Sequence, residues 1–244
     1  MARRGDKATS AIERRVAAVD WLAVAAALDE RGFATVPELL APAQCRALAG
    51  LYDDGEQFRS RVVMQRHAFG RGKYQYFAYP LPPPVEQLRR VIYPLLAPVA
   101  DRWNEHLRRD QRFPPTLDGY LAQCHEAGQT RPTPLMLKYG AGDYNRLHQD
   151  RYGAVAFPLQ ATVFLSRKDE DFAGGEFLLV EQRPREQSRG TALAPEQGQA
   201  LIFPTQYRPV QGKRGYLRAG MRHGVSTVTC GTRHTLGVIF HDAE

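Results

Sequence analysis

The sequence has no long hydrophobic run. None of its apolar segments approaches the roughly 20 residues that a membrane-spanning helix requires. The longest segment near the start, Leu22–Leu28, is closed by Asp20 and Asp29, which makes it a poor core for a signal peptide. The pattern therefore predicts a protein without a membrane span or a secretory signal.

Cysteine is also scarce. The three cysteines lie far apart, form no CxxC pair and are odd in number: Cys45, Cys124 and Cys230. This excludes a disulfide scaffold and fits the reduced thiols of a cytoplasmic protein. We therefore expect a cytoplasmic location.

The remaining composition is that of a globular protein. Hydrophobic residues make up 43% of the 244 residues and charged residues 24%, which excludes collagen-like and wholly disordered chains. A chain of this length can bury a large core without a metal or a disulfide. Lysine and arginine exceed aspartate and glutamate by 33 − 26 = 7, a surplus that favours polyanionic partners.

The two halves of the chain differ in their hydrophobic patterns. Helical spacing of apolar residues predicts helices over 11–31, 41–51 and 85–109, with short strands over 33–36, 59–64 and 73–79, the last two flanking a turn at 70–72. The second half has short apolar runs separated by glycine-rich or proline-rich turns, at 135–139, 154–166, 175–180, 200–203, 224–229 and 234–240. This pattern is typical of an all-β barrel or jelly roll. We predict a basic flexible arm over 1–10 and a single domain over 11–244, with a helical half (11–133) and a β core (134–244).

One histidine and one aspartate have the spacing of metal ligands. On a strand, His148 and Asp150 point to one face, so both can reach one ion. His223 is predicted to begin another strand, 73 residues beyond Asp150. Two histidines and a carboxylate form the ligand face of non-haem Fe(II) oxygenases, which leaves positions for a cosubstrate and dioxygen.

An arginine ten residues after His223 suggests an anion site. Arg233, Thr235 and Gly237 share one face of the last predicted strand, while Leu236, Val238 and Phe240 share the other. A buried arginine needs a paired anion, and its fork of donors suits a carboxylate such as the distal one of 2-oxoglutarate. Tyr139 could donate its phenolic hydrogen to the same carboxylate. A surface salt bridge is the alternative for Arg233 taken alone.

The order of these motifs resembles the 2-oxoglutarate/Fe(II) dioxygenase superfamily. The resemblance covers about residues 134–243 and includes Tyr139-Gly140-Ala141-Gly142, His148-x-Asp150, Gly174-Gly175-Glu176-Phe177, His223-x-Val225 and Gly231-x-Arg233. It implies a mostly β fold with N-terminal helices: a double-stranded β-helix, or jelly roll, with helices packed on the major sheet. It also implies Fe(II) at His148, Asp150 and His223, 2-oxoglutarate at Arg233, Tyr139 and Thr235, and dioxygen as the second cosubstrate.

A narrower resemblance points to DNA. The segments 172–177, 181–185, 208–212 and 221–226 are similar to a bacterial oxygenase family described as acting in oxidative demethylation of damaged DNA, like the AlkB-type enzymes. Two positions depart from the AlkB type. Ile239 replaces a second arginine six residues after Arg233, and Leu137 replaces an asparagine two residues before Tyr139. The cosubstrate site is therefore expected to resemble that of the prolyl hydroxylases.

Two stretches combine basic and aromatic residues. Glu56 is the only acid between Gly55 and Tyr79, and no acid lies between Pro204 and Arg222. Cations contact phosphates and aromatic rings stack on exposed bases. The candidate substrate contacts are Arg71, Lys73, Tyr74, Tyr76, Arg208, Lys213 and Arg214. The alternative is a solvated charged face whose aromatic residues belong to the core.

Three functions follow from these observations. The first is demethylation of alkylated bases in DNA, single-stranded or flipped out of a duplex, by an Fe(II)- and 2-oxoglutarate-dependent dioxygenase. The second is a hydroxylase of a protein, an amino acid or a small metabolite. The third is a non-catalytic metal-binding barrel or sensor. The sequence predicts no partner protein.

Overall fold

A computed structural model of the chain describes residues 9–150 and 153–244. Most of the predicted basic arm, residues 1–8, lies outside the described residues. Ser10 caps the first helix, because its hydroxyl accepts from the N–H of Glu13 (3.1 Å) and the Glu13 carboxylate accepts from the N–H of Ser10 (2.7 Å). Ser10 therefore belongs to this helix rather than to the arm.

The described chain contains α1 (Ala11–Ala17), α2 (Trp21–Arg31), α3 (Pro42–Gly50), α4 (Pro83–His106) and α5 (Leu117–Glu126). The prediction of one helix over 11–31 was wrong, because the Asp20 side chain accepts from the N–H of Ala23 (3.0 Å) and begins a new helix. Helix α2 is followed by Gly32, whose φ of 80° suits a left-handed C-terminal cap. None of the helices in the described chain is long and apolar enough to cross a membrane.

The strands form two antiparallel sheets. In the major sheet the order is β1 (Ala34–Val36), β11 (Ala200–Pro204), β7 (Leu159–Phe164), β14 (Val228–Val238), β5 (Leu135–Gly140), β4 (Lys73–Phe77) and β2 (Phe58–Val63), with β8 (Phe172–Gly174) beside β14. In the minor sheet the order is β10 (Arg189–Leu193), β9 (Phe177–Gln182), β13 (Gly215–Val225), β6 (Tyr144–His148) and β3 (Gly70–Arg71), with β12 (Tyr207–Gly212) beside β13. The turn expected at residues 70–72 thus contains a short strand, and β1, β2 and β4 bring the N-terminal half into the major sheet.

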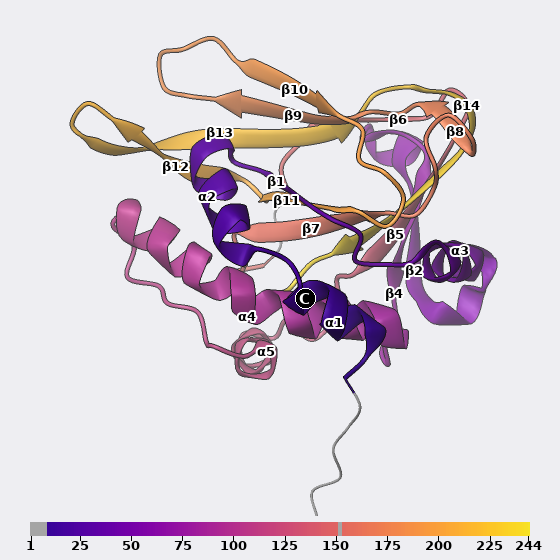
Figure 1. The fold of residues 1–244 in the computed structure, drawn as a ribbon, viewed down its shortest axis with the longest axis horizontal. Coiled ribbons are helices and arrows are strands. Elements are labelled where there is room, and N and C mark those ends of the chain that lie inside the picture. Colours follow the sequence, from indigo (N-terminus) through magenta and orange to yellow (C-terminus); the bar gives the residue numbers. More distant parts are fainter. Residues whose placement is uncertain (1–8, 151–152) are drawn as a thin grey trace, which may run out of the picture.

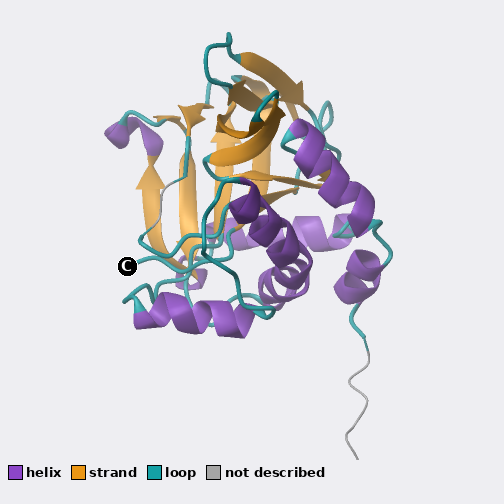
Figure 2. Cartoon of the chain, turned by 90° about the vertical axis from the view of Figure 1, so that its left-hand side faces the viewer, coloured by secondary structure: helices purple, strands orange, loops and turns teal. Residues whose placement is uncertain are grey.

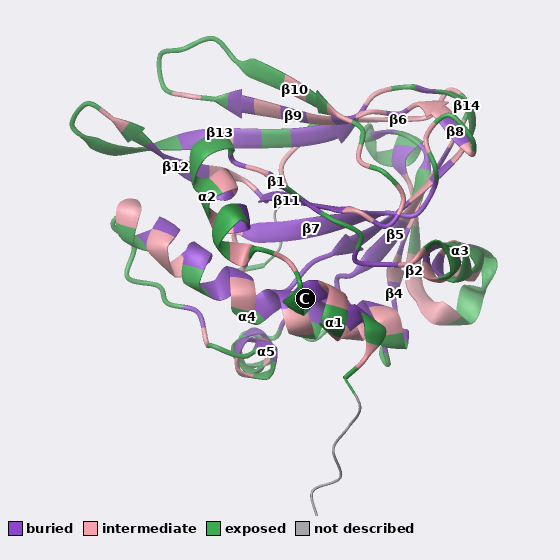
Figure 3. Cartoon of the chain, in the orientation of Figure 1, coloured by how far each residue is buried: buried purple, intermediate pink, exposed green. Residues whose placement is uncertain are grey.

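The two sheets face each other, and α1, α4 and α5 lie on the outer side of the major sheet (Figure 1). The orthogonal view shows most helical segments outside the strand layers (Figure 2). The main hydrophobic core joins these helices to the major sheet, and buried residues follow α4 and β7 (Figure 3). This arrangement confirms the predicted jelly roll with helices packed on the major sheet.

Strand β14 shows the predicted alternation of faces. Leu236 and Val238 of β14, and Phe240 just beyond its end, lie in the core beneath the helices, whereas Arg233 and Thr235 line a cavity between the sheets. The strand begins earlier than expected, however. Residues 230–232, which separate the predicted runs 224–229 and 234–240, are an irregular part of β14, where the pairing with β8 shifts and Gly231 has a φ of 76°.

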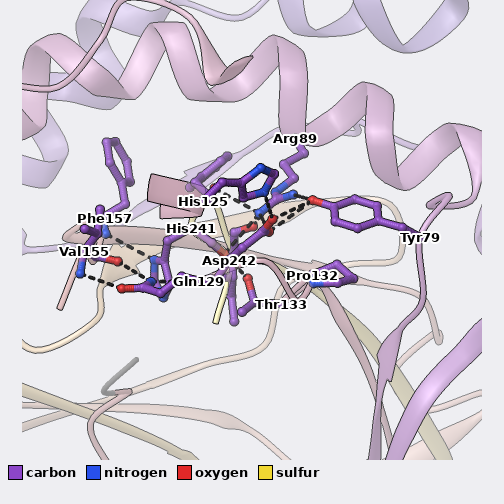
Figure 4. A network of polar contacts seen from close by, with 12 residues as sticks. Tyr79, Arg89, His125, Gln129, Pro132, Thr133, Val155, Phe157, His241 and Asp242 are labelled. Atoms are coloured by element: carbon purple, nitrogen blue, oxygen red, sulfur yellow. Dashed lines mark hydrogen bonds and ion pairs between the residues drawn. The ribbon is translucent and has the colours of Figure 1, made fainter. Parts of the chain in front are cut away.

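The end of the chain is held by a buried polar network (Figure 4). Arg89 of α4 and Asp242 are both fully buried and form an ion pair of 2.7 Å. The Asp242 carboxylate also accepts from the hydroxyl of Tyr79 (3.0 Å) and lies 3.0 Å from Nε2 of His125. Gln129 donates to the carbonyl of Asp242 (2.5 Å) and exchanges hydrogen bonds with the backbone of Val155, in the segment that follows Asp150. The network therefore ties the C-terminus to Val155.

Candidate active site

The structure brings the three predicted metal ligands together. His148 is the last residue of β6, and His223 lies directly opposite it on β13. Nε2 of His148 is 3.6 Å from Oδ1 of Asp150, and Nε2 of His223 is 3.3 Å from Oδ2. All three ligand atoms lie within 4.8 Å of one another. This spacing lets one ion contact all three side chains.

Two details of this cluster differ from the sequence prediction. His223 lies near the end of the long strand β13 and does not begin a strand. Asp150 lies beyond the end of β6, so strand alternation does not place it beside His148. Its backbone is held by other contacts: its N–H donates to the carbonyl of Thr205 (3.2 Å), and its carbonyl accepts from the side chain of Gln206 (2.9 Å).

The protonation states of His148 and Asp150 suit a metal ion. Nδ1 of His148 lies 2.7 Å from the carbonyl of Arg146, so Nδ1 carries the proton and Nε2 keeps its lone pair. Burial and the neighbouring His223 lower the pKa of His148, which favours the neutral ring that metals bind. Burial alone would raise the pKa of Asp150, but the two imidazoles and the amide of Gln160 hold it well below its ordinary value.

Arg233 is a buried cation without a counter-ion. It is 1% exposed, and none of its three side-chain nitrogens has a hydrogen-bond partner among the described residues. Its guanidinium carbon lies between 5.4 and 5.9 Å from the ring centres of Tyr139, Phe164 and Phe172. Burial lowers the pKa of Arg233 to about 10. A buried charge of this kind lowers the stability of the folded protein unless an anion binds to it.

Tyr139 and Thr235 lie in the same cavity as Arg233. Tyr139 is fully buried, and its hydroxyl oxygen accepts from the side-chain amide of Asn145 (3.3 Å). The phenolic proton of Tyr139 therefore remains available to an acceptor in the cavity. Asn145 was not predicted from the sequence, since its role depends on the pairing of β6 with distant strands.

One cavity of about 340 Å³ joins the metal cluster to Arg233. The predicted substrate residues Tyr74 and Tyr76 line it, with their ring centres 5.5 Å apart at an interplanar angle of 89°. Phe69, which was not predicted, also lines it and is 47% exposed. Leu137 and Ile239, the two departures from the AlkB type, line the cavity as well.

The basic residues predicted to contact the substrate lie in two different places. Arg71 and Lys73 are exposed and flank Gly72, where an added Cβ would lie 2.8 Å from the ring of Tyr139. Lys213 and Arg214 form the turn between β12 and β13. Arg214 is nine residues from His223 along an extended strand, which corresponds to roughly 30 Å.

The prediction for Arg208 was wrong. Its side chain is 2% exposed and pairs with the Glu181 carboxylate at 2.6 Å. It also donates to the backbone carbonyls of Asp29 (2.9 Å) and Glu30 (3.2 Å). Because all of its donors face protein atoms, Arg208 joins α2 to the minor sheet and is not available to a substrate.

The jelly roll, the His-Asp-His cluster and the adjoining buried arginine are the features of an oxygenase that uses Fe(II), 2-oxoglutarate and dioxygen. Residues 72–243 match an oxygenase family described as catalysing oxidative methylation of damaged DNA, and the chain belongs to this family. Over 167 residues it is 52% identical to the uncharacterized proteins MT2286 and Rv2227 of Mycobacterium tuberculosis, covering 68% of this chain and 72% of each relative.

Solved structures show the same fold. A prolyl-4-hydroxylase of Pseudomonas putida has a TM-score of 0.56 at 16% identity, covering 92% of this chain and 99% of that chain. A prolyl hydroxylase from Trichoplax adhaerens, in complex with a peptide fragment of hypoxia inducible factor, has a TM-score of 0.53 at 14% identity, covering 95% and 92%. At these identities the likeness concerns the fold alone.

Proposed function

We propose that the protein demethylates alkylated bases in DNA by oxidation. The observation that carries the proposal is that one cavity holds the metal cluster, an aromatic wall of Tyr74, Tyr76 and Phe69, and Arg233, which has no hydrogen-bond partner among the described residues. Aromatic rings accept the flat face of a base, and a base reaches such a cavity from a single strand or after flipping out of a duplex. The family description and the basic surplus support a DNA substrate.

In this proposal His148, Asp150 and His223 hold Fe(II), which with 2-oxoglutarate and dioxygen supplies the hydroxylation of a C–H bond. Two neutral imidazoles and one ionised carboxylate are the donor set that non-haem Fe(II) takes. An N-methyl group would become a hydroxymethyl group that leaves as formaldehyde and restores the N–H. 2-Oxoglutarate would become succinate and carbon dioxide in the same turnover.

The chain's own residues orient the cosubstrate. Arg233 would pair with the distal carboxylate of 2-oxoglutarate, and this carboxylate would serve as the counter-ion of the guanidinium. Tyr139 would donate its phenolic proton to that carboxylate, because Asn145 already occupies the acceptor side of its hydroxyl. Thr235, 2% exposed, presents a further hydroxyl to the same part of the cavity. Leu137 and Ile239 present apolar side chains to the same cavity.

A second candidate is the hydroxylation of a protein, an amino acid or a small metabolite. It is favoured by Leu137 and Ile239, since these apolar residues line the cavity where the AlkB type has polar ones. The two candidates differ in their products. A demethylase releases formaldehyde, whereas a hydroxylase leaves a product heavier by one oxygen atom.

The experiment uses purified protein with Fe(II) and 2-oxoglutarate under anaerobic conditions, followed by oxygen and a panel of methylated oligonucleotides. The expected result is the unmethylated oligonucleotide by mass, with formaldehyde and succinate in equal amounts. An unmethylated oligonucleotide is the matched control. Succinate formation that no methylated oligonucleotide stimulates would reject the DNA substrate and favour the second candidate.

A further inference from the structure

We infer that Gln160 is a positioning residue of the metal centre: its side-chain amide holds the Asp150 carboxylate in the orientation in which it faces the two histidines. The inference rests on the metal site of the proposed function. Gln160 lies on β7 of the major sheet, whereas His148 and His223 lie on the minor sheet. The contact therefore joins the two layers across the cavity.

Asp150 needs such a contact because it lies beyond the end of β6. Its bonds to Thr205 and Gln206 hold the main chain and do not involve the carboxylate. Nε2 of Gln160 lies 2.6 Å from Oδ2 of Asp150, and Gln160 is 4% exposed. A bond of this length to an ionised carboxylate is charge-assisted and stronger than one between neutral groups.

The orientation of the Gln160 amide follows from chemistry. An ionised carboxylate only accepts hydrogen bonds, so the NH₂ group of Gln160 must face Asp150. The backbone of Gln160 is in turn fixed by its place opposite Phe203 in the pairing of β7 with β11. The donor is therefore held by the sheet and not by a mobile loop.

The bond keeps both oxygens of Asp150 near the imidazoles, at 3.3 Å from Nε2 of His223 and 3.6 Å from Nε2 of His148. Rotation of the carboxylate would separate these atoms. A preformed ligand set loses less conformational freedom on binding a metal, so metal affinity depends on groups that orient the ligands.

The test compares Gln160→Met with Gln75→Met. Methionine keeps the approximate length of glutamine and removes the donor. Gln75 is a matched control, because it is 3% exposed on β4 and donates to the carbonyl of Tyr52 at 2.6 Å, yet it does not line the cavity. Binding of Mn(II) to the metal-free protein is measured from the electron paramagnetic resonance signal of free Mn(II), without cosubstrate. The absorption spectrum of the Co(II)-loaded protein reports the ligand geometry.

We expect Gln160→Met to weaken Mn(II) binding about 10- to 100-fold and to alter the Co(II) spectrum. Gln75→Met should leave the Mn(II) affinity and the Co(II) spectrum unchanged, although it should lower the folding stability about as much as Gln160→Met does. Gln160→Asn, which is shorter by one methylene and cannot reach Asp150, should reproduce the loss in affinity if Gln160→Met fails to fold.

Wild-type affinity and an unchanged Co(II) spectrum in a folded Gln160 variant would overturn the inference and leave the proposed function intact. An equal loss of affinity in Gln75→Met would also overturn it, since the effect would then be structural. Failure of the wild-type protein itself to bind Mn(II) or Co(II) would instead reject the metal site on which both proposals rest.

Discussion

Replacement of Arg233 by methionine should change the stability of the protein and its affinity for 2-oxoglutarate in opposite directions. The side chain is 1% exposed, and its three nitrogens have no partner within the described chain. Burial lowers the pKa of Arg233 from its ordinary value to about 10. At 1.36 kcal/mol for each tenfold change in proton affinity, the charged form costs about 3 kcal/mol in the empty protein at neutral pH.

Methionine removes this cost and keeps much of the volume. We therefore expect the free energy of unfolding of the empty Arg233→Met variant to equal the wild-type value or to exceed it by about 1–3 kcal/mol. The affinity for 2-oxoglutarate should fall, because loss of a buried ion pair costs about 3–5 kcal/mol. This corresponds to an increase in Kd of about two to three and a half orders of magnitude.

The assay is urea unfolding of the empty protein, followed by thermal unfolding with Mn(II) and increasing 2-oxoglutarate. At 100 times its Kd, 2-oxoglutarate should stabilise the wild type by about 2.7 kcal/mol, an increase in Tm of about 5–11 °C. Arg233→Met should show little increase at the same concentration.

Arg208→Met is the matched control. Arg208 is as deeply buried as Arg233 but pairs with Glu181, so its loss should destabilise the protein by about 3–5 kcal/mol and leave the response to 2-oxoglutarate intact. The reasoning is refuted if Arg233→Met destabilises the empty protein as much as Arg208→Met does and still responds to 2-oxoglutarate like the wild type.

Three further predictions concern other parts of the molecule. Asp242→Ala should lower the free energy of unfolding by about 3–5 kcal/mol in urea titrations, because it leaves Arg89 charged, buried and without its ion pair. Asp110→Ala is the control, and it should have little effect because Asp110 is exposed. Burial lowers the pKa of His241 to about 4, below its unfolded value, so the free energy of unfolding should fall as the pH drops from about 6.5 to 4. His241→Asn, which can still accept from the N–H of Phe157, should make the free energy of unfolding depend less on pH in this range. An unchanged pH dependence in this variant would contradict the lowered pKa of His241. Replacing both Lys213 and Arg214 by glutamine should weaken the binding of long single-stranded oligonucleotides and reduce the slope of log K against log salt concentration by one to two units. The turnover of short oligonucleotides should not change, because these residues lie roughly 30 Å from the metal cluster. Equal effects on short and long oligonucleotides would contradict this placement.

The fold was largely predictable because its signals are local. Alternating apolar residues separated by glycine and proline turns predict many short strands, and the alternation in β14 placed Arg233 and Thr235 opposite Leu236 and Val238. The break between α1 and α2 was missed, since helical spacing continues across it and the capping bond of Asp20 is the competing signal. Local periodicity therefore indicated element types better than their boundaries.

The site was predictable only in part. Metal-ligand residue types at characteristic spacings indicated His148, Asp150 and His223, and the structure brings these residues together. Gln160 carried a weak signal, a single amide within an apolar run, but its contact with Asp150 depends on how β7 faces the other sheet. No sequence pattern indicated that Asn145 belongs to the site.

The sequence by itself determined which residues of β14 share a face, because side-chain direction follows from the backbone period alone. It did not do so for Asp150, which lies beyond the end of β6. It also determined the order of the chemical groups along the chain. Only the tertiary structure decided which of these groups meet, since contacts between distant segments depend on the packing of whole sheets. That packing buried Arg208 against Glu181 and left Arg233 buried without an anion, although both are arginines in apolar strands. It also placed Lys213 and Arg214 at the tip of a hairpin and Tyr74 and Tyr76 at the cavity.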